Sequence, residues 1–253
     1  MNAQHAEVTA LFKQLRMPHA RTIVEEVLQT AKTQRWEPAE TVKVFLQTEV
    51  AGRHASMLAT KRKRARFPTG KTFDAWDPDL STIPLPTQQF LRGLEWVDRH
   101  ENVVLCGPAG TGKSLFAEAL GQTAIDAGKT VAWLTVEDLD QLITRHRIDH
   151  SITKAITRVL NVDVVCVDDI GLLPVSEAAA EGLYRVVDAA YEKRSVIVTS
   201  NVHPSGFDQV LPKTLATATV DRLLHHAHLC QTSGESVRYQ QAQSGAGVMS
   251  MAG

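Results

Sequence analysis

The sequence predicts an α/β protein with a five-stranded parallel sheet, preceded by a small all-helical segment. Three observations predict this class. A glycine-rich loop stands between an apolar run and a helical pattern, a second apolar run ends in two aspartates, and strand-like and helix-like patterns alternate through the rest of the chain. Crossover helices return the chain to the edge where the next strand starts, so this alternation produces a parallel sheet with helices on both faces.

The glycine-rich loop, residues 107–114, fulfils the pattern G-x-x-x-x-G-K-[ST] without a mismatch. Its glycines let the backbone curl so that N–H groups point at phosphate oxygens, and the helix start adds a positive dipole end. Lys113 is placed to reach the β- and γ-phosphates, and the Ser114 hydroxyl to ligate Mg²⁺. We therefore expect a nucleoside-triphosphate site made of Gly107, Pro108, Ala109, Gly110, Thr111, Gly112, Lys113, Ser114 and Leu115.

The second apolar run, residues 164–169, ends in Asp168 and Asp169. A continuous apolar run indicates a strand buried on both faces, and parallel sheets bind ligands at the carboxyl ends of their strands. Asp168 is then the carboxylate that holds Mg²⁺, and Asp169 can orient and deprotonate an attacking water. The alternative is that the two acids only cap the next helix. Together with the loop, the pair predicts an ATPase or GTPase.

Composition bounds the class of protein. The 253 residues, 43% of them hydrophobic, suffice for one large domain with a smaller appendage. No apolar run approaches the roughly 18 residues of a membrane span, and the N-terminus lacks the apolar core of a signal peptide. Three cysteines form no disulfide framework, and Cys106 and Cys166 lie in expected core strands. We expect a cytoplasmic protein without a membrane partner.

The net charge of −1 conceals an asymmetry, because residues 1–72 hold 13 Lys and Arg against 6 Asp and Glu. Such a basic segment suggests a polyanionic partner. Its strongest feature, residues 61–66, is either a solvated helix end or a surface that follows DNA phosphates without sequence choice. The candidate DNA-binding residues are Arg53, Lys61, Arg62, Lys63, Arg64 and Arg66, with Arg145 and Arg147 as a second, weaker set.

The sequence predicts three helices in the N-terminal segment. Apolar residues at helical spacing predict a helix through Leu11 and, after the break at Met17-Pro18, a second over residues 20–31. A third helix is expected to start at Pro38, because proline suits the first turn of a helix, and to carry the basic run at its end.

Residues 67–100 are interpreted as a linker, because prolines interrupt regular structure there. Phe73 and Trp76 offer apolar anchors within it. A last helix before the glycine-rich loop is expected to be capped by Thr87 and to extend to Val97.

Strands and helices alternate after residue 100. Ser151 is expected to cap a short helix on the second crossover. The expected strands cover residues 103–106, 130–136, 164–169, 195–200 and a weaker stretch near 228–230, and the helices cover 115–127, 152–159 and 176–193, with a further helix from 137.

Three histidines, His225, His226 and His228, stand close together near the end of the chain. No cysteine or carboxylate stands at ligand spacing, and two of the three would diverge on a strand. We interpret them as structural or surface residues rather than as metal ligands. The tail from Gln240, rich in Gln, Ser, Ala and Gly, is expected to be disordered.

The order of these motifs resembles that of an AAA+ ATPase, since a strand ending in Thr199-Ser200-Asn201 follows the two aspartates. Ala218-Thr219-Val220-Asp221-Arg222-Leu223 resembles the AAA+ segment that supplies an arginine finger. Gly234-Glu235-Ser236-Val237-Arg238 resembles the G-E-S-x-R end of the IstB and DnaC group. With the basic run before Phe67-Pro68, nearly the whole chain is similar to the IstB-like transposition helper ATPases of bacterial insertion sequences.

The resemblance implies an AAA+ P-loop three-layer sandwich that binds ATP and Mg²⁺. It places Asn201 at the first sensor position, Arg222 as the finger that enters the neighbouring subunit's site, and Arg238 as the second sensor. Two departures are Asp169, where many AAA+ proteins carry Glu, and Val237, where family members often have Tyr. Asp is one methylene shorter than Glu, which bears on the geometry of the base.

The resemblance also implies a homo-oligomer that assembles with ATP on double-stranded DNA, hydrolyses ATP when stimulated by DNA, and recruits a partner transposase. Two alternatives stay open, a DnaC-like helicase loader and a switch that binds nucleotide without useful turnover. The expected domains are 1–66, a helical basic domain for DNA binding or assembly; 67–100, the linker and lead-in helix; 101–239, the ATPase domain; and 240–253, the tail.

Overall fold

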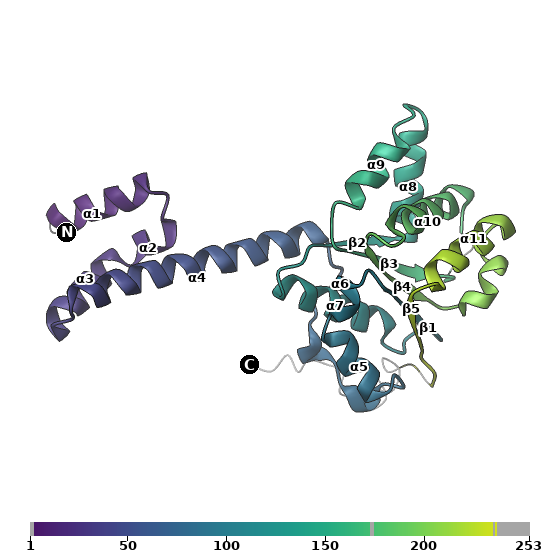
Figure 1. Cartoon of the computed structure of the whole chain (residues 1–253), viewed down its shortest axis with the longest axis horizontal. Helices are drawn as coiled ribbons and strands as arrows, with labels where there is room; N and C mark the ends of the chain where they lie inside the picture. Colours follow the sequence, from purple (N-terminus) through teal and green to yellow (C-terminus); the bar gives the residue numbers. More distant parts are fainter. Residues whose placement is uncertain (1–2, 173–174, 235, 237–253) are drawn as a thin grey trace, which may run out of the picture. The chain divides into compact units, whose positions relative to one another are not determined.

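The computed structural model describes residues 3–172, 175–234 and 236. It divides the chain into two compact units, Met1–Thr60 and Lys61–Gly253 (Figure 1). The predicted tail, residues 240–253, lies outside the described residues. In the part that is described, no helix is both long and apolar enough to cross a membrane.

The N-terminal unit consists of α1 (Ala3–Gln14), α2 (Pro18–Thr22), α3 (Val24–Gln34) and most of α4 (Pro38–Ala65). The start at Pro38 is as predicted, but the single helix expected over residues 20–31 is wrong. The chain breaks at Ile23, which leaves Ala20 and Val24 buried together against Phe45. The buried Glu49 carboxylate holds the start of α2, because it accepts the backbone N–H groups of residues 19 and 20 in the first turn at 2.9 and 3.0 Å.

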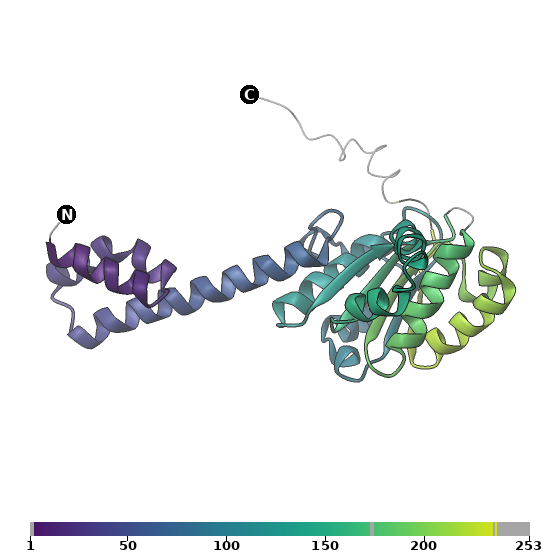
Figure 2. The ribbon, with the colours of Figure 1, turned by 90° about the horizontal axis from the view of Figure 1, so that it is seen from above.

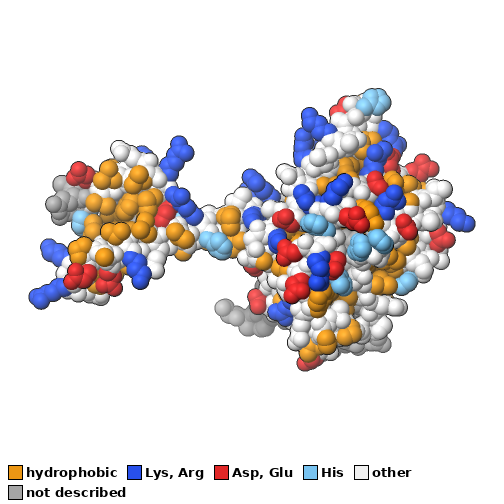
Figure 3. All heavy atoms as spheres, in the orientation of Figure 1, with side chains coloured by type: hydrophobic (Ala, Val, Ile, Leu, Met, Phe, Trp, Pro, Cys, Tyr) orange, Lys and Arg blue, Asp and Glu red, His pale blue; other side chains and the backbone are white. Residues whose placement is uncertain are grey.

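An apolar stripe remains exposed on this unit. It comprises Leu11 and Leu15 of α1 with Val42, Leu46 and Val50 of α4, and each of these side chains is more than half exposed. Figure 3 shows hydrophobic side chains gathered on this unit. Apolar stripes of this kind usually mark contact surfaces.

The linker contains two short 3₁₀ turns, η1 (Phe73–Ala75) and η2 (Pro78–Leu80), followed by α5 (Leu85–Arg92) and α6 (Glu95–Asp98). The predicted cap at Thr87 is wrong, because α5 starts one turn earlier with Pro84 at its N-cap. A continuous helix to Val97 is also wrong. Leu94 adopts a left-handed backbone conformation, φ 63°, and separates the two helices.

The five predicted strands form one parallel sheet in the order β2-β3-β4-β1-β5. The three inner strands are almost entirely buried and mostly apolar, which is the pattern expected when helices cover both faces. The strands are β1 (Asn102–Cys106), β2 (Val131–Thr135), β3 (Val164–Ile170), β4 (Ser195–Ser200) and β5 (Ala227–Gln231).

Helices cover the two faces of the sheet and produce three layers (Figure 2). One face carries α7 (Lys113–Asp126), and the other carries α8 (Val136–Arg147), α10 (Glu177–Ala190) and α11 (Lys213–Leu224). A short helix, α9 (Ile152–Val159), precedes β3, and the 3₁₀ turn η3 (Pro204–Gln209) precedes α11. Ser151 occupies the N-cap position of α9 but makes no capping bond; its hydroxyl bonds Asp149 instead.

Candidate nucleotide-binding site

The glycine-rich loop connects β1 to α7, as the sequence predicts. Gly107, Gly110 and Gly112 have φ values of 143°, 83° and 88°, which side chains strongly disfavour. A Cβ atom on Gly107 would lie 2.1 Å from the carbonyl oxygen of Thr232, and one on Gly112 would lie 2.8 Å from the ring of Trp76. The loop therefore needs glycine both for its curl and for the close approach of neighbouring segments.

Lys113, the first residue of α7, lies largely buried beneath this loop. Its Nζ donates hydrogen bonds of 2.7 Å to the carbonyl oxygens of Gly107 and Pro108 and one of 3.0 Å to Oδ1 of Asn201. The ammonium thus sits at the carboxyl edge of the sheet, within the loop that surrounds it.

Asp168 and Asp169 end β3 at the same edge. Thr199 and Ser114 hydroxyls bond the Asp168 carboxylate. Burial raises the pKa of Asp168, the two hydroxyl bonds oppose this, and the adjacent charge of Asp169 raises it further. A half-buried carboxylate beside a hydroxyl and a second acid supplies the oxygen donors that Mg²⁺ prefers, so these residues fit the ion.

Asp169 differs from its neighbour, because it is exposed and has a left-handed backbone with φ 71°. The pairing of β3 with β4 shifts register between Val167 and Ile170, so the chain bulges at the two acids. The Thr199 hydroxyl accepts the Asp169 N–H at 2.9 Å, and Asn201 Nδ2 donates to Asp169 Oδ1 at 2.9 Å. The bulge aims this carboxylate away from the sheet and into the cavity.

A cavity of about 530 Å³ lies at this edge of the sheet, and Asp168 is not among the residues that line it. Its walls include residues 109–115 of the loop and helix start, together with Asp169 and Asn201. Of the predicted nucleotide-binding residues, Gly107 and Pro108 do not line it, although their carbonyl groups hold Lys113.

The linker forms the opposite wall, which sequence reasoning missed. Glu118 of α7, 2% exposed, accepts hydrogen bonds from the backbone N–H and the hydroxyl of Thr69. Trp76 packs on Phe116 with ring centroids 4.9 Å apart, and its Nε1 donates to Gln88 at 2.8 Å. The aromatic anchors were noted in the sequence, but a buried glutamate that binds a distant backbone segment leaves no local pattern.

Of the two arginines expected at the nucleotide, as the finger and as the second sensor, the structure describes Arg222 alone. Arg222 is on α11, where its Nε pairs with Asp188 of α10 at 2.7 Å and its guanidinium lies 5.6 Å from the Tyr184 ring centroid. It does not line its own chain's cavity. Arg238 lies outside the described residues, whereas Ser236, two residues before it, lies close to Gly110.

The basic run divides into paired and exposed residues. Lys61 donates to the carbonyl oxygen of Gly128, and Arg62 bonds Gln122 and Asp126 of α7. Lys63, Arg64 and Arg66 are exposed. The first two cations therefore attach the end of α4 to α7, and the other three face solvent.

The remaining DNA candidates also differ in their surroundings. Arg53 pairs with Glu49 at 2.7 Å and donates to the Arg16 carbonyl oxygen, so it has a role inside the N-terminal unit. Arg147 pairs with Glu181 at 2.7 Å, and Arg145 is exposed.

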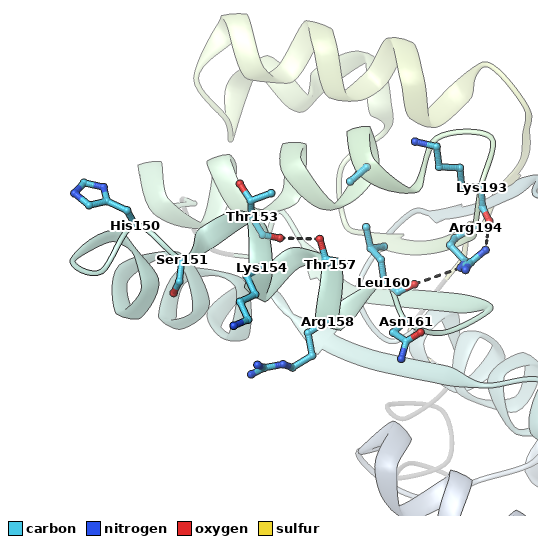
Figure 4. Close-up of a pocket in the computed structure, with 11 residues that line it drawn as sticks. His150, Ser151, Thr153, Lys154, Thr157, Arg158, Leu160, Asn161, Lys193 and Arg194 are labelled. Carbon is cyan, nitrogen blue, oxygen red and sulfur yellow. Dashed lines mark hydrogen bonds between the residues drawn. The ribbon is translucent and has the colours of Figure 1, made fainter.

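A second concave surface lies along α9. This groove, of about 1110 Å³, is lined by eleven residues that include Lys154, Arg158, Lys193 and Arg194 but no carboxylate. Figure 4 shows the side chains of Lys154 and Arg158 extending from the same side of α9. Arg194 bonds the Leu160 carbonyl oxygen at 3.3 Å. The groove is cationic and was not predicted from the sequence.

Comparison with known proteins places this geometry in a family. The sequence pattern of the family described as IstB-like ATP binding protein matches residues 10–245. The chain belongs to this IstB-like family. Among its relatives, an ATP-binding protein of insertion sequence IS21 from Pseudomonas aeruginosa is 33% identical over 245 residues, which cover 96% of this chain and 92% of the relative.

Solved structures show that the fold of this IstB-like protein is that of AAA+ ATPases. AMPPCP-bound DnaA from Aquifex aeolicus aligns with a TM-score of 0.55 at 20% identity, over 71% of this chain and 56% of DnaA. The DnaC helicase loader aligns with a TM-score of 0.52 at 18% identity, over 65% of this chain and 98% of that protein. The predicted fold class and family resemblance are confirmed.

Proposed function

We propose that this protein is a DNA-stimulated ATPase that assembles on double-stranded DNA and recruits a partner transposase during transposition of an insertion sequence. The observation that carries the enzymatic part is the meeting of the loop cation and the acidic pair at one edge of the sheet. Asn201 bonds both Lys113 and Asp169, so the phosphate-binding group and the candidate base share one neighbour.

The reaction is hydrolysis of ATP to ADP and phosphate. Lys113 and the loop N–H groups bind the phosphates, and the linker wall with Trp76 lies beside the remainder of the nucleotide. Asp169, held by Asn201, orients the attacking water and accepts its proton. Ser114 and Asp168 would hold Mg²⁺, which neutralises charge on the phosphates when bound.

Arg222 completes the site of the next subunit in this proposal. Its position on α11, outside the cavity of its own chain, supports a role in trans. ATP then favours assembly, because the site is whole only between two subunits, and hydrolysis weakens the assembly. The exposed apolar stripe of α1 and α4 supplies a further surface for contacts between subunits.

DNA binding in this proposal uses two surfaces of the ATPase unit. Lys63, Arg64 and Arg66 face solvent and can neutralise phosphates, and the groove with Lys154 and Arg158 offers cations without a carboxylate among its lining residues. Contacts of this kind bind the phosphates of the DNA backbone and do not distinguish one base sequence from another.

The transposition role follows from the relatives. The name of the Pseudomonas aeruginosa relative assigns it to an insertion sequence, and that protein is covered over 92% of its length. The helicase-loader alternative has support from the fold of DnaC, but at 18% identity this likeness concerns the fold alone. We therefore prefer a transposase as the partner.

The test is phosphate release by the purified protein with and without duplex DNA. We expect turnover that DNA stimulates, and loss of both nucleotide binding and turnover in Lys113→Ala, because the cation beneath the loop is removed. Lys129→Ala is the matched control, since that lysine pairs with Asp98 instead. Undiminished ATP affinity of Lys113→Ala in calorimetry would contradict the site.

A transposition assay then separates the two partners. The protein is combined with an insertion-sequence transposase, ATP and target DNA, and strand-transfer products are measured. Stimulation by the parent and not by Lys113→Ala supports the proposal. Loading of a replicative helicase onto DNA, without any effect on strand transfer, would support the alternative.

A further inference from the structure

The histidines near the C-terminus acquire a carboxylate partner in the folded chain. His225 caps the C-terminus of α11, His226 follows it, and Glu192 lies in the turn after α10. Each offers one ligand atom, and the three atoms lie within 4.8 Å of one another. Glu192 is remote from these histidines in the sequence, so only the packing of α10 against α11 brings it to them.

We propose that Glu192, His225 and His226 form a binding site for a divalent transition-metal ion of the Zn²⁺ class. Two imidazoles and one carboxylate are a ligand set that Zn²⁺ uses with a fourth position left for water or another molecule. Ligand atoms around tetrahedral Zn²⁺ lie about 3.3 Å apart, given metal–ligand distances of about 2.0–2.1 Å. The three side chains are exposed and rotate about their χ angles, so they can close from the observed spacing.

Tyr191 orients one of the ligands. Its hydroxyl lies 2.7 Å from Nδ1 of His225 and also bonds the Glu192 side chain. A phenol has one proton, so when it donates to Glu192 its oxygen accepts the Nδ1 proton of His225. The Nε2 lone pair of His225 is then left for a cation. Metal-binding histidines usually have such a partner on the other ring nitrogen.

His228 and the cysteines do not belong to this site. His228 Nε2 bonds Glu101 at 2.7 Å, and the ring packs on Phe90 with centroids 4.9 Å apart. Burial raises the pKa of the Cys230 thiol to about 11, which keeps it from forming a thiolate ligand. The predicted divergence of the histidines is therefore correct for His228, whereas His225 and His226 lie together, with ring centroids 4.0 Å apart.

The ion would connect the end of α10 to the end of α11, next to the Arg222–Asp188 pair. Both imidazoles bind the ion in their neutral form, so protons compete with the ion for the site. This site lies outside the nucleotide cavity and is independent of the proposed function.

The test is titration of the metal-free full chain with Zn²⁺ in calorimetry, without nucleotide. Co²⁺ serves as a second probe, because its visible absorption reports tetrahedral nitrogen and oxygen ligands. We expect one Zn²⁺ per chain that His225→Ala/His226→Ala loses, and at least a tenfold lower affinity in Glu192→Gln, which keeps the side-chain shape. His203→Ala is the matched control, since His203 is an exposed histidine bonded to Ser205.

Circular dichroism of each variant establishes that it is folded. Equal Zn²⁺ affinity in the parent and the double variant, or no binding by the parent, would overturn the proposal. Loss of binding in Glu192→Gln with retention in His203→Ala would support it even if the double variant failed to fold.

Discussion

Asn201 and Asp169 are joined by a hydrogen bond of 2.9 Å from Nδ2 of the amide to Oδ1 of the carboxylate. The other end of the same amide accepts a hydrogen bond from Lys113. In the proposed mechanism the Lys113 ammonium turns to phosphate oxygens when ATP binds, and Asn201 is left to orient Asp169 and the water. The proposal thus assigns to one polar side chain the connection between nucleotide binding and the group that activates the nucleophile.

The first prediction concerns this connection. Asn201→Ala should bind ATP with nearly the parent affinity but hydrolyse it about 10²-fold more slowly, because the carboxylate and the water lose their orienting partner. Single-turnover phosphate release and calorimetry measure the two effects separately. Gln141→Ala, which removes an exposed amide bonded to Glu137 on α8, is the control. An unchanged rate in Asn201→Ala would show that Asp169 is held by other groups.

The second prediction concerns pH. The pKa of Asp168 is raised by burial, so its folded-state pKa lies above the unfolded value of about 3.9. The stability linked to this group is present below the unfolded pKa and is lost as pH rises through the folded one. Asp168→Asn should therefore raise the free energy of unfolding of the nucleotide-free protein at neutral pH, and the gain should shrink in acid.

Asp163 provides a control of opposite sign. Burial alone would raise the pKa of Asp163, but hydrogen bonds from the side chain and backbone of Thr130 hold it below the usual value. Its stabilisation is present above the unfolded pKa and is lost as pH falls through the folded one. At pH 7.5 and at pH 5.0, the urea midpoint of Asp168→Asn should thus lie above that of the parent protein, and the midpoint of Asp163→Asn should lie below it. If both variants shifted the urea midpoint in the same direction relative to the parent, this interpretation would be excluded.

The sequence was sufficient for the sheet and for the loop because both depend on local patterns. Apolar runs predict buried strands, and the spacing of glycines around Lys113 leaves few other conformations. The breaks at Ile23 and Leu94 could not be predicted in this way. The helical periodicity of the apolar residues continues through each break, so the sequence pattern gives no sign of either one.

In the candidate site, too, local patterns predict some features and leave others undetermined. Asp168 and Asp169 were recognisable at the end of an apolar run, but the bulge that turns them apart arises from pairing with β4. The linker wall depends on Glu118, whose partner Thr69 is remote in sequence. Interactions between separate segments decide these features, and a single sequence records no pairing between segments.

The third prediction separates the cations of the basic run. Lys63→Ala/Arg64→Ala should weaken duplex binding equally across sequences and reduce the salt slope by up to about 0.9 for each lost phosphate contact. Lys61→Ala/Arg62→Ala removes the same charge but should mainly destabilise the attachment of α4 to α7, because those two side chains bond Gly128 and Asp126. Fluorescence anisotropy over a salt series measures the slope. An identical slope in the parent and in Lys63→Ala/Arg64→Ala would mean that these residues only solvate the helix end.

The groove along α9 is tested in the same assay. Lys154→Ala/Arg158→Ala should also lower the salt slope, since both side chains line a concave surface with no carboxylate among its lining residues. Lys32→Ala, on α3 outside the groove, is the matched control. A slope that changes equally in the control would indicate a general effect of net charge.

The last prediction concerns Arg222 and the assembly. In one chain Arg222 is paired with Asp188 and stays outside the nucleotide cavity. In the proposed assembly it exchanges Asp188 for a phosphate in the site of another subunit. Arg222→Ala should bind ATP through its intact loop but hydrolyse it roughly 10³-fold more slowly, as expected for the loss of an arginine finger. Arg185→Ala, which removes an arginine paired with Glu181 on α10, should retain activity.

Mixing two inactive variants separates a role in trans from a structural role. Lys113→Ala lacks a working loop and Arg222→Ala lacks the finger, but an interface that pairs the loop of the second with the arginine of the first restores one complete site. The mixture should therefore regain DNA-dependent ATPase activity, and the activity should rise steeply with protein concentration because sites form only by association. If the mixture stays inactive while the parent hydrolyses ATP at the same specific rate down to clear monomer, Arg222 only stabilises the contact between α10 and α11. The cation that stabilises the transition state would then have to come from the same chain.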